Sequence, residues 1–177
     1  MEPQIANGRV RDVSGLHGFL LGKLATSGLV SASFAAAACR RTGEWFDLDG
    51  GLDARTPSVA LRKASRAQGR ALLRAGRAMW RLPDVGREPH QPVALGALAA
   101  AAGLSPVEAA VAAAHGTVTG VASAAVRLLG LDPYAVHALL ARLAPECDRI
   151  AADAADRSGD PVDELPAAGA PLLDIGA

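Results

Sequence analysis

Residues 105–130 read SPVEAAVAAAHGTVTGVASAAVRLLG, and this stretch indicates the class of fold. Ser105, a proline and then Glu108 form the capping box that begins an α-helix, and Gly130 is a residue type that commonly ends one. Alanine, the best helix former, fills most of the interval, and residues 109–126 carry no charge. The stretch therefore predicts a central helix that is buried in a bundle.

The composition of the whole chain agrees with this interpretation. Among 177 residues, 50% are hydrophobic but only 3% are aromatic, and alanine is the commonest residue. A chain with so few β-branched and aromatic residues predicts an all-α fold, here a single-domain bundle of about five to seven helices. The 18 basic residues balance 18 acidic ones, which argues against a protein whose whole surface binds nucleic acid.

Glycine, proline and capping residues divide the chain into segments. Residues 44–55, EWFDLDGGLDAR, are expected to form a loop, and residues 158–177 a flexible acidic tail rich in Pro and Gly that follows a helical domain over 1–157. Pro145 is expected to kink or split the last helix, and Gly28 is a candidate break in the first. The predicted helices cover about 12–41, 57–82, 92–102, 106–129 and 133–157.

Two apolar stretches raise the question of a membrane or secretory segment. Residues 18–39, GFLLGKLATSGLVSASFAAAAC, resemble a signal segment before a lipid-modified cysteine, but Lys23 interrupts the run and Ala36 stands where a large aliphatic residue is expected. The uncharged run at 109–126 is mostly alanine, which contributes little to membrane insertion. Cys39 and Cys147 form neither a disulfide framework nor a metal-ligand pattern. We therefore expect a cytoplasmic protein without a membrane segment.

The helix predicted over 57–82 is strongly amphipathic. At 100° per residue, seven cations lie within an arc of about 120°, and the roughly opposite arc is apolar and is expected to be buried. Gln68 lies near the middle of that apolar arc and so needs a fixed hydrogen-bond partner, whereas Gly69 and Gly76 lie on another side, where a second helix could approach. The cations are Arg62, Lys63, Arg66, Arg70, Arg74, Arg77 and Arg81; the apolar arc holds Leu61, Ala64, Ala71, Leu72, Ala75 and Met79, with Ser65 at its edge.

The basic face has two interpretations that the sequence leaves open. It is either a solvated surface balanced by the acidic end of the chain, which runs from Asp132 to Asp174, or a docking site. A docking site would take an acidic protein partner or, with less support, phosphates.

Four stretches of the sequence show a resemblance to a known family. Residues 54–80, ARTPSVALRKASRAQGRALLRAGRAMW, resemble the signature helix of UreF, the urease accessory protein, and His90-Gln91-Pro92-Val93 follows it as in that family. Residues 123–155, SAAVRLLGLDPYAVHALLARLAPECDRIAADAA, resemble the family's late helices, and the closing PLLDIGA is similar to its tail. Compared with the family pattern, this chain is expected to lack an N-terminal segment and the extreme C-terminal tail.

The resemblance implies an all-helical, dimeric accessory protein. Its partners would be a UreD/UreH-type accessory protein, the nickel-carrying GTPase UreG and, through the complex, apo-urease. The residues expected to bind a partner are Arg62, Arg66, Arg70, Arg74, Arg127 and Tyr134. Structural roles are expected for Ser65, Gln68, Gly69, Gly116 and Gly120, of which the last two suit a close helix approach that could serve the homodimer.

No motif for a nucleophile, a phosphate loop or a paired-histidine metal site is present, so no catalytic, cofactor-binding or metal-ligating residue is predicted. His17 and His90 are expected at the surface or in caps, His115 in the core, and His137 is a weak candidate for a transient nickel path. Both cysteines are expected to be small apolar fillers. The leading prediction is a non-enzymatic adaptor in nickel insertion; the alternative is a helical nucleic-acid-binding regulator that uses the basic face of residues 62–81.

Overall fold

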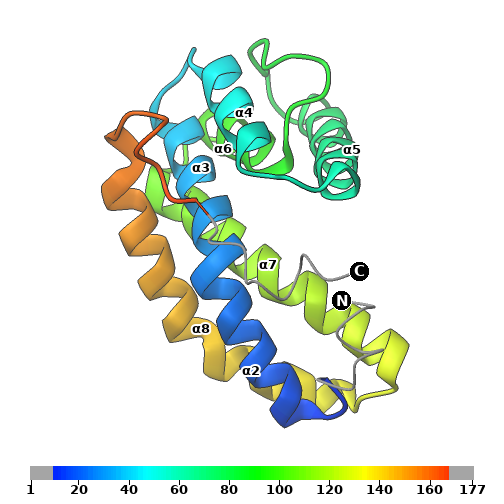
Figure 1. Cartoon of the computed structure of the whole chain (residues 1–177). Coiled ribbons are helices and arrows are strands. Elements are labelled where there is room, and N and C mark those ends of the chain that lie inside the picture. The colour runs from blue at the N-terminus through cyan, green and yellow to red at the C-terminus, as the bar shows by residue number, and fades with distance from the viewer. Residues whose placement is uncertain (1–9, 168–177) are drawn as a thin grey trace.

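The structure, a computed structural model, describes residues 10–167, and within that range it contains helices and no strand (Figure 1). The all-α prediction is confirmed, and there are six helices when the continuous run from Val13 to Arg40 is counted once. In chain order the elements are α2 (Val13–Lys23), a π-helical turn (Leu24–Gly28), α3 (Leu29–Arg40), α4 (Trp45–Ala54), α5 (Val59–Gly76), α6 (Gln91–Ala101), α7 (Pro106–Leu129), α8 (Pro133–Asp156) and a 3-10 turn (Arg157–Gly159).

The predicted signals at the ends of α7 are all present. The Ser105 hydroxyl accepts the Glu108 N–H, and the Glu108 carboxylate accepts the Ser105 N–H at 2.7 Å. Gly130 adopts the left-handed conformation, with φ of 64°, and ends the helix. Helix α8 begins at the cap of Asp132 and continues through Pro145 without interruption, so the chain is not split at that proline.

Helices α2, α3, α7 and α8 enclose the larger hydrophobic core. Its buried side chains are chiefly alanines from α3, α7 and α8 together with leucines such as Leu16, Leu20 and Leu139. Both Val13–Arg40 and Pro106–Leu129 are long and apolar enough to cross a membrane, yet each also packs along one side against other helices of this bundle. Packing in the helical core accounts for the apolar residues on that side of each helix.

Residues of α3, α4 and α6 form most of a second core, in the upper part of the view in Figure 1. Helices α3 and α6 approach closely at Gly96, because any larger residue there would overlap the backbone of α3 at Ala35. The predicted loop at 44–55 is wrong, since Trp45–Ala54 forms α4. Its glycines and aspartates suggest a loop, but burial of Trp45, Leu48 and Leu52 on one face outweighs that local preference.

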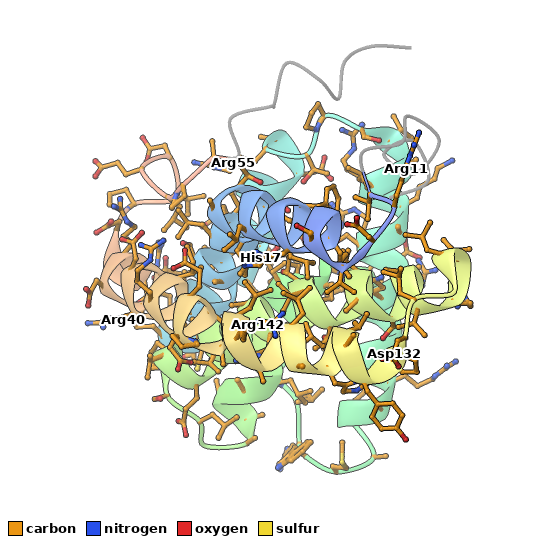
Figure 2. All side chains as sticks on the ribbon, turned by 90° about the horizontal axis from the view of Figure 1, so that it is seen from below. Arg11, His17, Arg40, Arg55, Asp132 and Arg142 are labelled. Atoms are coloured by element: carbon orange, nitrogen blue, oxygen red, sulfur yellow. The ribbon has the colours of Figure 1, made fainter. Side chains whose placement is uncertain are left out.

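The prediction of a flexible tail from residue 158 also needs correction. Ser158 and Leu165 are buried, and the guanidinium of Arg55 (labelled in Figure 2) donates to the carbonyl oxygens of Val162, Asp163 and Leu165 at 2.8–3.0 Å. Residues 158–167 are therefore held against the bundle. The rest of the predicted tail, 168–177, lies outside the described residues.

Candidate functional site

A buried histidine connects α5 to the rest of the chain. His90 is the N-cap residue of α6, in agreement with the expected capping position, but its side chain is fully buried and forms no capping hydrogen bond, so the expectation of a surface residue is wrong. Its Nδ1 atom lies 3.0 Å from the Ser65 hydroxyl on α5, and its Nε2 atom lies 3.0 Å from a carboxylate oxygen of Asp53 on α4. One imidazole ring thus joins three helices.

Both ring nitrogens of His90 have a hydrogen-bond partner. The Ser65 hydroxyl lies beside Nδ1 and also accepts the Gln91 N–H at 3.1 Å. An ionised carboxylate only accepts hydrogen bonds, so Nε2 donates its hydrogen to Asp53. Both ring nitrogens are thereby satisfied, as a buried polar side chain requires.

Arg66 reinforces the same network. Its guanidinium donates to Asp49 at 2.9 Å, to Asp53 at 2.8 Å and to the carbonyl oxygen of Glu88. Hydrogen bonds from Arg66 and then from His90 lower the pKa of Asp53. Burial alone would lower the pKa of Arg66, but its bonds to Asp53 and Asp49 raise it above the ordinary value. Arg66, predicted to bind a partner protein, is therefore engaged within its own chain.

The Ser65–His90–Asp53 contacts contain the residue types of a hydrolase triad, which sequence spacing did not reveal. They do not form an accessible nucleophile, because His90 is fully buried and the Ser65 oxygen is held by the Gln91 N–H. Neither the groove beside Trp45 and Arg81 nor the one between α7 and α8 is lined by these three residues. The arrangement orients helices rather than substrates.

The side of α5 that is buried differs from the prediction. Gly69, Leu73 and Gly76 face the protein, whereas Leu61 and Met79 of the predicted core arc are 63% and 62% exposed. A side chain at position 69 would overlap the carbonyl oxygen of Pro89, and one at position 76 would overlap Leu98 of α6. The glycines allow a close approach that the opposite side of the helix could not make. Gln68 is accordingly exposed, and the prediction that it is buried with a fixed partner is wrong.

The remaining predicted arginines of α5 differ in availability. Arg70 forms a 2.9 Å ion pair with Glu88, and Arg62 donates to the backbone carbonyl oxygens of Thr56 and Pro57. Arg74 is exposed and has no ion pair within residues 10–167. The same holds for three further cations of this segment, Lys63, Arg77 and Arg81.

Arg127 and Tyr134 lie away from α5, near the α7–α8 turn. Both are exposed, Tyr134 by 85%, beside a groove of about 290 Å³ between these helices. His137 borders that groove, and its Nδ1 atom lies 2.7 Å from the carbonyl oxygen of Pro133. Gly116 and Gly120 are exposed on α7, and an added side chain would meet open space, so they do not serve close packing within this chain.

The other predicted metal and thiol residues are separated from one another. His17 is exposed on α2, as expected, while His115 is only partly buried on α7. Cys39 and Cys147 are buried, and burial raises the pKa of both thiols, in agreement with an apolar filling role. Within the described part of the chain, no three His, Cys, Asp or Glu side chains gather as a metal site.

Comparison with known proteins gives a consistent result. The UreF family matches residues 10–144. A urease accessory protein UreF from Mycobacterium sp. (strain JLS) is 46% identical over 178 residues, which cover 99% of this chain and 81% of the relative. A UreF from Mycolicibacterium vanbaalenii is 43% identical with the same coverage, and one from Mycobacterium tuberculosis is 41% identical over 93% of this chain and 80% of its own length. The predicted resemblance to this family is thereby confirmed, and the chain belongs to the UreF family of urease accessory proteins.

Proposed function

We propose that this chain is an adaptor in urease maturation, bridging a UreD/UreH-type subunit and the nickel-carrying GTPase UreG while nickel is loaded into apo-urease. The observation that carries the proposal is the family match over residues 10–144. Members of this family are accessory proteins, so the chain is not an enzyme. In this proposal GTP and nickel are held by the partners, and the chain acts through its protein-binding surfaces.

The proposal places the protein in the cytoplasm and as a homodimer. Two buried, unpaired thiols suit a reducing compartment. The uncharged outer side of α7, which carries Gly116 and Gly120, is the surface that we assign to a second copy, because glycines permit two backbones to approach. Gly116→Leu with Gly120→Leu should then yield monomers in light scattering, whereas Gly18→Leu with Gly22→Leu, at open positions on α2, should not.

The adaptor role is tested by restoring urease in a strain that lacks the gene for this chain. Urease activity at limiting nickel should return with the wild-type chain, and affinity purification should recover the chain together with the UreD/UreH-type and UreG-type proteins. Urease that matures equally well without the chain would contradict the proposal. So would a wild-type chain that binds neither protein.

The nucleic-acid alternative rests on the seven cations between residues 62 and 81, an interval without any acidic residue. Ion pairs and hydrogen bonds of Arg62, Arg66 and Arg70 within the chain reduce that positive charge. Micromolar affinity for random duplex DNA with a steep negative dependence on salt would favour this alternative.

A further inference from the structure

The outward side of α5 and of the turn after it carries both unpaired cations and exposed apolar side chains. Three cations, Lys63 and Arg74 on α5 and Arg77 in the turn that follows it, are exposed and have no ion pair in the described range. The nearby carboxylates of Asp49, Asp53 and Glu88 already pair with other arginines. The net charge of the whole chain is zero, so this concentration of positive charge is local.

Apolar side chains accompany these cations. Val59, Leu61 and Met79 are each more than half exposed, and Trp80 is 37% exposed. Between them the outermost line of the helix consists of exposed alanines: Ala60, Ala64, Ala67, Ala71 and Ala75. An alanine line of this kind lets another backbone come close, and the longer apolar side chains at both ends would lose water on contact.

The position of α5 leaves this surface open. The helix lies at one edge of the molecule, with α6 on its inner side, and its Gly69 and Gly76 face inward (Figure 1). The network of Ser65, His90 and Arg66 holds that orientation through hydrogen bonds. The apolar arc therefore stays outward because the opposite side of the helix is fixed.

We infer that the outer face of α5 and of the turn that follows it, defined by Leu61, Lys63, Arg74, Arg77 and Met79, docks an acidic surface of a partner protein in the maturation complex. This inference rests on the proposed function. Charge complementarity selects the occupant: carboxylates at the rim would pair with the free cations while small and apolar side chains pack on the alanine line. A phosphate backbone would satisfy the cations but leave Leu61 and Met79 uncovered, so a protein surface fits better than a nucleic acid.

The experiment measures binding of the full chain to purified UreG-type and UreD/UreH-type proteins from the same organism. Arg74→Glu with Arg77→Glu forms the charge variant, and Leu61→Ser with Met79→Ser forms the apolar variant. Arg11→Glu with Arg142→Glu is the matched control, since both arginines are exposed and lack ion pairs in the described range, Arg11 just before α2 and Arg142 on α8 (both labelled in Figure 2). Charge and control variants undergo the same change in net charge.

We expect both α5 variants to keep the wild-type melting temperature and to weaken binding to one of the two proteins by at least about tenfold, because like charges and exposed polar groups would then face the partner. The control should bind as the wild type does. Unchanged binding by either α5 variant, when the wild type binds, would overturn this inference and leave the proposed function intact. A wild-type chain that binds neither protein would overturn both.

Two parallel probes identify the wrong occupant. If the charge variant loses affinity for random duplex DNA or for phosphatidylserine vesicles while its binding to both proteins is unchanged, the face serves a phosphate-rich surface and the inference fails. If the same variant turns a dimer into a monomer, the occupant is a second copy, and the inference fails as well.

Discussion

The α2–α3–α7–α8 bundle and helix α5 are stabilised by different means. In the bundle, alanines and leucines from four helices pack into one apolar core. Helix α5 contributes only Leu73 to the buried core, with Leu72 beside it, and is held through glycine contacts and a polar network around His90. The difference shows that amphipathicity alone does not orient a helix, because the apolar arc of α5 faces outward.

The bundle should respond most strongly to loss of apolar volume. Leu139→Ala removes a fully buried side chain from α8, and we expect it to lower the free energy of unfolding by about 2–5 kcal/mol. Leu128→Ala, at a position 48% exposed on α7, is the matched control and should cost less than about 0.5 kcal/mol. Urea denaturation gives both values, and equal losses would contradict the assignment of this core.

For α5, the sharpest test is a substitution that adds a methyl group to its inner side. Gly69→Ala places a methyl against the carbonyl oxygen of Pro89, and we expect a loss of about 1–3 kcal/mol in unfolding free energy despite the better helix propensity of alanine. Gly18→Ala meets open space on α2 and should instead raise the stability by up to about 1 kcal/mol. A stabilising Gly69→Ala would show that α5 does not lie on the 89–90 backbone.

The polar network makes part of the stability depend on pH. Because Arg66 and His90 hold the pKa of Asp53 below its ordinary value, ionised Asp53 stabilises the folded chain above about pH 4. That contribution is lost as the pH falls through the lowered pKa. Asp53→Asn should therefore reduce the melting temperature at pH 7, and its difference from the wild type should shrink toward pH 3. A difference that stays constant over this range would contradict the role given to Asp53.

The smallest expected effect is at Gln68. The side chain is exposed, so Gln68→Ala should change the unfolding free energy by less than about 0.5 kcal/mol. A loss of about 1–3 kcal/mol in urea denaturation would mean that a buried hydrogen-bond partner is left unsatisfied. That result would restore the orientation of α5 expected from its apolar arc.

Local sequence signals predicted much of the bundle. The capping box at Ser105 and Glu108, the glycine at 130 and the cap at Asp132 fix the ends of α7 and the start of α8, because their hydrogen bonds form within a few residues. Helix α4 was missed because Gly50, Gly51 and its aspartates resemble a loop. Its stability comes from burial of Trp45, Leu48 and Leu52, which only the tertiary structure provides.

The candidate site depended still more on tertiary contacts. Asp53, Ser65 and His90 are far apart in the chain and share no spacing rule, so no sequence pattern predicts their contact. The sequence predicts a close approach at Gly69 and Gly76, and the structure has one. The sequence also predicts burial of the apolar arc, which instead faces outward. Which side of an amphipathic helix is buried depends on the surface it meets, here the 89–90 backbone and Leu98 of α6.

The central claim is that the apolar and basic side of α5 faces solvent in the free chain, and thiol labelling at position 68 tests it most directly. The natural cysteines are buried, so Gln68→Cys supplies the reactive thiol, and Leu73→Cys reports the inner side of the same helix. We predict that the thiol at 68 reacts with a maleimide as fast in the native chain as in urea, while the thiol at 73 is protected until the chain unfolds. Protection at 68 with rapid labelling at 73 would contradict the claim.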